Sequence, residues 1–97
     1  MAFERVWHKS YAPGVPPEIE IQKVTVGEAL IRTAKRFPDH TAFIFMGRRI
    51  TYRELDTLVN RFANALTELG VKAGDKVGML LPNLPQVIVA NHAVHRL

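Results

Sequence analysis

The sequence predicts an α/β fold, in which a β-hairpin and covering helices precede the start of a βαβ unit. Two stretches have the T-x-x-E spacing of a helix capping box, and apolar residues at three- and four-residue steps follow each of them. Two short apolar runs, residues 41–46 and 76–81, have the length and composition of buried strands. Helical and strand-like patterns that alternate along one chain are typical of the α/β class.

Residues 1–24 form the first predicted unit, an extended N-terminal arm. Three prolines between residues 13 and 17 resist helix formation and favour an extended path. The arm is also rich in apolar side chains, so we expect it to lie against the rest of the chain with Trp7 or Tyr11 as its anchor. The second predicted unit, residues 25–97, is an incomplete N-terminal α/β subdomain of a larger protein.

The first helix is predicted over residues 26–37. Thr25 and Glu28 supply its capping box, in which the hydroxyl accepts from one free helix N–H and the carboxylate accepts from another. Lys35 and Arg36 lie in the last turn, where the helix dipole favours cations, so no bound phosphate is needed to explain them. The stripe expected to face the core consists of Val26, Ala29, Leu30, Ala34 and Phe37.

A hairpin is predicted to follow. Residues 41–46 read as a strand that is covered on both faces, because they are almost continuously apolar. Gly47 and Arg48 have the composition of a two-residue hairpin link, after which residues 49–51 return beside the first strand.

The longest predicted helix starts at about Tyr52 and is closed by Gly70. Thr51 and Glu54 form its capping box, and a glycine after the last periodic residue supplies the left-handed conformation that ends many helices. The apolar stripe of this helix consists of Leu55, Leu58, Val59, Phe62, Leu66 and Leu69.

The last elements are a turn at residues 71–75, an apolar strand at 76–81 and a helix that starts at Pro85. This helix is apolar around much of its circumference, so we expect it to be buried on more than one side. A buried strand followed by a helix is the first part of a βαβ unit, whose second parallel strand is absent from the 97 residues. We therefore expect an N-terminal piece of a larger α/β protein; in the alternative, a homodimer covers the exposed sheet edge.

The composition excludes several classes of protein. The chain is 47% hydrophobic and 23% charged, as expected of a globular unit, and it has neither a transmembrane run of about 20 apolar residues nor a secretory signal. A cytoplasmic protein is the simplest interpretation. The absence of cysteine rules out disulfides and thiolate metal sites. The net charge is +4, but the cations are dispersed and are not interleaved with aromatics, so we do not expect nucleic-acid binding.

No catalytic, cofactor-binding or metal-binding residue can be assigned from the sequence. His92 and His95 are three residues apart on the last predicted helix, but no nearby carboxylate or third histidine completes a zinc set. Asp39 and His40 read as a polar turn without a nucleophile. The isolated glycines form neither a G-x-G-x-x-G motif nor a phosphate loop, and the prolines of the LLPNLPQ passage remove backbone donors.

The order of these blocks resembles the N-terminus of the adenylate-forming acyl-CoA synthetase superfamily. The similar blocks are a helix and F-P-D before an apolar strand, then I-T-Y-R-E-L, a long helix, G-V-K-A-G-D-K-V and L-P-N, which together cover about residues 25–86. The earlier VWHKSYAPGVPPEIEI is similar to the leader of bacterial long-chain fatty-acid CoA ligases.

The resemblance implies a parent enzyme that activates a long-chain fatty acid with Mg-ATP and transfers the acyl group to CoA. It implies that this chain is the N-terminal portion of the large domain, and that the family's phosphate loop, adenine and magnesium motifs and catalytic lysine lie beyond Leu97. We therefore expect a scaffold that alone binds no ATP, Mg or CoA, in a cytoplasmic enzyme for which attachment to a membrane surface is left open. The alternative is a stand-alone interaction or dimerisation module.

Overall fold

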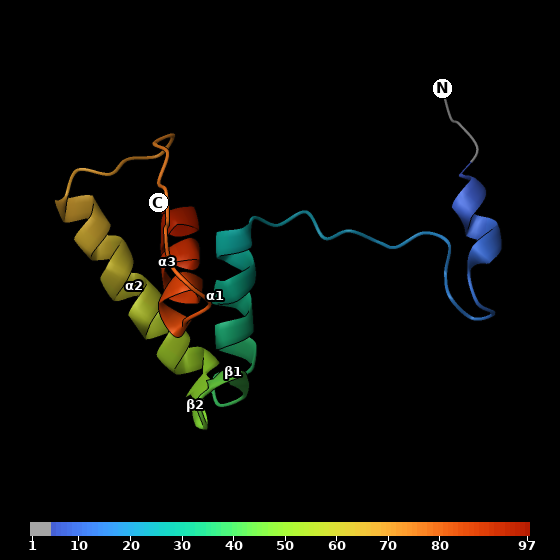
Figure 1. The fold of residues 1–97 in the computed structure, drawn as a ribbon, viewed down its shortest axis with the longest axis horizontal. Coiled ribbons are helices and arrows are strands. Elements are labelled where there is room, and N and C mark those ends of the chain that lie inside the picture. The colour runs from blue at the N-terminus through green and yellow to red at the C-terminus, as the bar shows by residue number, and fades with distance from the viewer. Residues whose placement is uncertain (1–4) are drawn as a thin grey trace.

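A computed structural model describes residues 5–97 and places three helices side by side, with a two-stranded antiparallel sheet at one end (Figure 1). The helix over Pro85–Arg96 packs against both of the other two long helices, and the short helix over Val6–Ser10 lies apart from this group (Figure 1). The elements in order are the 3-10 helix η1 (Val6–Ser10), α1 (Val26–Arg36), β1 (Thr41–Phe45), β2 (Arg48–Thr51), α2 (Tyr52–Glu68) and α3 (Pro85–Arg96).

Both capping boxes are confirmed. The Glu28 N–H donates to the Thr25 hydroxyl at 3.1 Å, and the Thr25 N–H donates to the Glu28 carboxylate at 3.4 Å. At the start of α2 the corresponding distances between Thr51 and Glu54 are 3.2 and 3.5 Å. Each box satisfies two backbone donors that the helix cannot pair, so both helices begin at the predicted residue.

The end of α2 is also fixed by local backbone bonds. Gly70 has a φ of 93°, which is the left-handed conformation expected at this position. The Gly70 N–H donates to the Thr67 carbonyl at 3.0 Å, and the Val71 N–H donates to the Leu66 carbonyl at 3.1 Å. This pair of bonds is the Schellman motif, which turns the chain sharply away from the helix axis.

The predicted hairpin forms, but its turn is one residue earlier than predicted. Phe45 pairs with Arg48, so the two-residue link is Met46–Gly47, whose φ angles of 47° and 80° have the signs of a type I′ turn. The prediction that this strand is covered on both faces was wrong for the described residues, because Ile44 is 59% exposed. A two-stranded sheet offers only one face to the helices, so its other face meets solvent.

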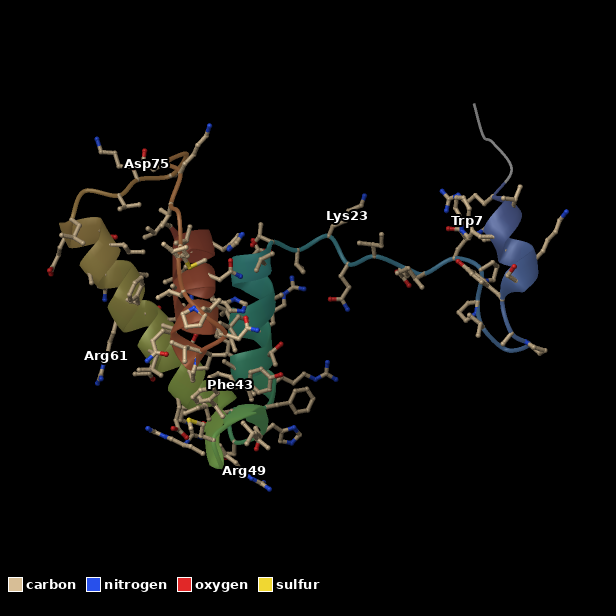
Figure 2. The ribbon with its side chains drawn as sticks, in the orientation of Figure 1. Trp7, Lys23, Phe43, Arg49, Arg61 and Asp75 are labelled. Atoms are coloured by element: carbon tan, nitrogen blue, oxygen red, sulfur yellow. The ribbon has the colours of Figure 1, made fainter. Side chains whose placement is uncertain are left out.

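The core lies where the three helices meet the hairpin. Its buried residues share small or medium size, which lets the helices approach closely; they are Leu30, Ile50, Leu55, Val59, Ala63, Ala90 and Ala93. Phe43 of the hairpin packs against this cluster (Figure 2).

The predicted stripes of α1 and α2 were wrong in part. On α2, Leu55 and Val59 are buried and Leu66 packs against the core, but the predicted members Leu58, Phe62 and Leu69 are exposed. Ala63, which was not predicted, is buried instead. On α1, Leu30 is buried as predicted and Ala34 is half-buried, whereas Val26, Ala29 and Phe37 are exposed.

The missed contact on α1 is a close approach to α3. A Cβ atom added to the buried Gly27 would lie 3.1 Å from the His95 carbonyl oxygen. Because α3 packs against α1 on one side and α2 on the other, its prediction as a helix that is buried on more than one side is confirmed.

Residues 76–81 do not form the predicted strand. In the part of the chain that the structure describes, the only sheet is β1–β2, and the chain from Val71 to Leu84 has no regular secondary structure. A strand requires a partner for its backbone groups, and the two strands of the hairpin pair with each other and not with this segment. The preceding turn is formed as predicted, with the Asp75 N–H donating to the Lys72 carbonyl at 3.1 Å.

The arm was predicted to lie against the helices, and this prediction was wrong. Trp7 lies away from α1, α2 and α3 and does not anchor the arm to them (Figure 2). The described residues of the arm contact one another instead: Arg5 pairs with Glu18 at 3.1 Å, and the rings of His8 and Tyr11 are 5.4 Å apart. The first four residues of the predicted unit 1–24 lie outside the described residues, and the boundary at residue 24 remains a prediction. Within residues 5–97, no helix is sufficiently long and apolar to cross a bilayer.

Candidate functional site

An open groove of about 470 Å³ lies between the hairpin, α2 and the start of α3. Two local features build it: the type I′ turn brings β2 back beside β1, and Pro85 at the first position of α3 directs the chain into a helix there. Its lining residues are mainly apolar and consist of Phe45, Arg48, Ile50, Leu58, Phe62, Leu84, Pro85, Gln86 and Val89.

The groove is suited to contact with an apolar surface rather than to chemistry. Only Arg48 and Gln86 bring a polar side chain to it, and the lining includes no carboxylate, histidine or hydroxyl that could act as a base or nucleophile. Leu58 and Phe62 are 39% and 41% exposed here, although their spacing placed them in the core. The apolar stripe of α2 is therefore wider than the surface that α2 buries against α3. The remaining apolar residues, Leu58 and Phe62, line the groove, so the sequence did contain a signal for it.

A polar link joins α3 to α2 on another side of the helices. The Arg96 guanidinium donates to the Asp56 carboxylate at 2.9 Å and to the Asn60 side-chain oxygen at 2.8 Å. The Arg96 side chain is 12% exposed and that of Asp56 is 33% exposed. This pair was not predicted, although Asp56 and Asn60 are four residues apart on one helix and therefore share a face.

A second ion pair is much more open to solvent. Arg53 and Asp39 are 3.1 Å apart, with side chains that are 64% and 78% exposed. Asp39 and His40 lie in the turn between α1 and β1, as predicted, and the His40 ring stacks on Phe37 at 4.9 Å. Carbonyl groups of this turn also pair with backbone N–H groups in the first turn of α2, which have no partner within the helix. The Tyr52 N–H donates to the His40 carbonyl at 3.0 Å, and the Arg53 N–H donates to the Pro38 carbonyl at 3.0 Å.

The two histidines of α3 lie in different environments. The His95 Nδ1 atom is 2.7 Å from the Asn91 carbonyl oxygen one turn earlier. The His92 Nδ1 atom is buried and has no hydrogen-bond partner. Residues 5–97 contain no group of three His, Asp or Glu side chains that could hold a metal ion.

Acidification should weaken the fold through His92. Partial burial, followed by the charges of His95 and Arg96, lowers the pKa of His92 from its ordinary value of 6.5. The unfolded chain then binds more protons than the folded chain at pH values between the lowered pKa and 6.5, so the free energy of unfolding should fall as pH decreases through this window. Urea unfolding of the chain at pH 7.5 and at pH values below 6.5 measures this loss.

The variant that tests this prediction is His92→Gln. It removes the titrating ring and should make the loss of stability below pH 6.5 smaller. An unchanged loss in His92→Gln would contradict the assignment to His92.

The comparisons with known proteins give a consistent set of similarities. Residues 30–97 match the family described as AMP-binding enzyme. The chain is 32% identical over 94 residues to a long-chain-fatty-acid–CoA ligase of Bacillus subtilis, and 38% identical over 95 residues to one of Yersinia pestis. These alignments cover 97% and 96% of this chain and 17% of each relative.

A third similarity covers less of the chain. This chain is 54% identical over 50 residues to an acetyl-coenzyme A synthetase of Magnetococcus marinus. The aligned residues make up 52% of this chain and 8% of the relative. No solved structure matches the chain. The chain thus spans about one sixth of the length of the long-chain ligases that it resembles.

Proposed function

The chain belongs to the AMP-binding enzyme family, and on this premise we propose that it is the N-terminal portion of the large domain of a long-chain fatty-acid CoA ligase. The predicted resemblance to adenylate-forming enzymes is confirmed at the level of the family. The observation that carries the finer proposal is the extent of the alignments. Those with long-chain-fatty-acid–CoA ligases include almost the whole chain and hence the arm, whereas the acetyl-coenzyme A synthetase aligns over about half of it.

The proposed reaction has two steps. A carboxylate oxygen of the fatty acid attacks the α-phosphorus of ATP, and pyrophosphate leaves, which gives an acyl-adenylate. The CoA thiol then loses its proton and attacks the acyl carbon, and AMP leaves with the electron pair of the broken C–O bond. Fatty acid, ATP and CoA are therefore the substrates of the proposed parent enzyme, which we expect to work in the cytoplasm or attached to a membrane surface.

We propose a supporting role for this chain in that enzyme. Mg²⁺ prefers several oxygen ligands, and the described residues do not provide a cluster of carboxylates. The groove likewise has no group that could move a proton or attack a carbonyl. On the resemblance to this family, we propose that the chain holds part of the large domain in place and that the reaction and the binding of ATP, Mg and CoA belong to other parts of the parent.

The test is an assay of acyl-CoA formation on two purified proteins, the parent enzyme and the 97-residue chain. The parent should form acyl-CoA from ATP, CoA and palmitate, and should form much less product from acetate. The 97-residue chain alone should form none. A preference of the parent for acetate would overturn the substrate class, and reproducible ATP-dependent product from the isolated chain would overturn the supporting role.

A second candidate function is a stand-alone interaction module that forms a homodimer. Its support is the exposure of large apolar side chains, among them Leu80 and Met79. Light scattering of the 97-residue chain discriminates between the two proposals. A stable dimer of 10.9 kDa subunits that buries these side chains would favour the module.

A further inference from the structure

Residues 44–49, here called the hairpin tip, include an apolar side chain that neither the backbone nor packing explains. Met46 is the first link residue of the type I′ turn, with a φ of 47°, and it is 90% exposed. A positive φ is uncommon for residues with a side chain, and this turn position favours Asn, Asp or Gly. Met46 therefore adopts an unfavoured backbone conformation without burying its side chain, which points to a role outside the fold.

The apolar surface continues from Met46 along β1. Ile44 is 59% exposed on the solvent face of the hairpin, and the partly buried Phe45 lines the groove on the opposite face. Three consecutive apolar residues thus occupy one end of the helix group, where the chain reverses (Figure 1). Exposed apolar surface of this kind marks contact with another protein or with a membrane.

Two arginines accompany these apolar residues. Arg48 is the cross-strand partner of Phe45, and Arg49 is the partner of Ile44, so each arginine shares a face of the hairpin with an apolar side chain. Arg49 lies at the same end of the molecule (Figure 2). Residues 40–52 contain no acidic residue, and within residues 5–97 no ion pair joins either arginine to a carboxylate. Both positive charges are therefore available to a partner.

We infer that the hairpin tip docks on the surface of a bilayer that contains anionic lipids. The apolar residues enter the boundary between headgroups and acyl chains, and the two arginines contact the lipid phosphates. The stem of an arginine can lie along apolar surface while its guanidinium group stays at the level of the headgroups. The inference deepens the proposed function, on which it rests, because it names the surface through which the parent enzyme attaches to a membrane.

Other partners fit the hairpin tip less well. A nucleic acid would use the arginines, but proteins that bind single strands stack bases on aromatic side chains, and the exposed side chain at the turn is the aliphatic Met46. A second copy of the chain, docked tip to tip, would bring like charges together. An anionic bilayer is complementary to both the apolar and the positively charged residues.

Sedimentation with lipid vesicles tests the docking of the parent enzyme and of the 97-residue chain. Both proteins should bind vesicles of phosphatidylcholine and phosphatidylglycerol at least about 10-fold more tightly than vesicles of phosphatidylcholine alone, and added salt should reduce this difference. Equal binding to the two kinds of vesicle would overturn the inference. Failure of the parent to bind would also overturn it, because another part of the parent would then cover the hairpin tip.

Met46→Asn tests the apolar contribution without disturbing the turn. Asn-Gly is a preferred pair for a type I′ turn, so the hairpin should remain formed. Affinity for the anionic vesicles should fall at least about 5-fold, because the variant removes apolar surface that would enter the bilayer. The control is Leu69→Asn, which removes an apolar side chain that is 81% exposed at the other end of α2 and should leave binding unchanged. Equal affinities of the two variants would contradict docking through Met46.

Arg49→Glu tests the electrostatic contribution. Reversing this charge should lower the affinity for the anionic vesicles at least about 10-fold, because the carboxylate is repelled by the lipid phosphates. Arg61→Glu makes the same change of net charge at an exposed position on α2 that lies away from the hairpin (Figure 2). Its effect should be less than about 3-fold, because charge interactions are screened over this distance. Equal losses would show that only the net charge matters and would overturn the assignment to the hairpin tip.

Two further measurements separate this inference from its alternatives. Binding to a DNA duplex of mixed sequence in place of the vesicles, with no effect of Met46→Asn, would assign the arginines to nucleic acid and overturn the inference. An acyl-CoA assay on the parent without vesicles tests the ligase proposal by itself. An inactive parent that docks on anionic vesicles would refute the ligase function and leave the docking intact, whereas an active parent that does not dock would overturn the docking alone.

Discussion

Val59→Asp is expected to leave the 97-residue chain unfolded in water. Val59 is the only large side chain of the described residues that is fully buried, and the cluster around it contains no buried polar group. A carboxylate at this position would lose its hydration without a partner, at a cost of several kcal/mol. Domains of this size are stable by only about 5 kcal/mol or somewhat more. Far-UV circular dichroism and urea titration should therefore show no cooperative transition.

Asn64→Asp is the matched control for this variant. It adds the same negative charge to the same helix at an exposed position, so the free energy of unfolding should change by no more than about 0.5 kcal/mol. A Val59→Asp variant that unfolds cooperatively at the wild-type urea concentration would contradict the placement of the core.

Asp56→Ala is expected to lower the free energy of unfolding by about 1–3 kcal/mol, which is the second large effect. The variant leaves the mostly buried Arg96 guanidinium without its charged partner, although Asn60 still accepts one of its hydrogen bonds. Removing one partner of a fully buried pair costs about 3–5 kcal/mol, and the smaller value expected here reflects the 33% exposure of Asp56.

Asp39→Ala is the control, because it breaks an ion pair of similar length whose side chains are mostly exposed. Its effect on urea unfolding should be at most about 0.5 kcal/mol. A double-mutant cycle with Arg96→Met then isolates the interaction of Asp56 with Arg96. A coupling energy near zero would contradict the proposed contribution of this pair.

The parts of the fold that depend on neighbouring residues were predictable from the sequence. Thr25 and Thr51 fix the starts of two helices through residues three positions away, and Gly70 ends α2 through bonds to the preceding turn. The hairpin was predicted for the same reason. Its turn was misplaced by one residue because Met46 adopts a positive φ, which is uncommon for a residue with a side chain.

The parts that depend on distant residues were not predictable. Periodicity shows that α2 has a wide apolar stripe, but the position of α3 determines that Val59 and Ala63 are buried while Phe62 lines the groove. Arg96 and Asp56 are 40 residues apart, so no local pattern joins them. Residues 76–81 have the composition of a strand but lack a partner within the described residues, and strand formation requires one.

The lack of backbone hydrogen bonds at residues 76–81 also bears on the tendency of the chain to aggregate. The sequence VGMLL has no charge and no proline, which is the composition of segments that associate into intermolecular β-structure. Lys76 precedes it and Pro82 follows it, and these two residue types interrupt such association. Lys76 and Pro82 are therefore gatekeepers that oppose aggregation while this segment is exposed.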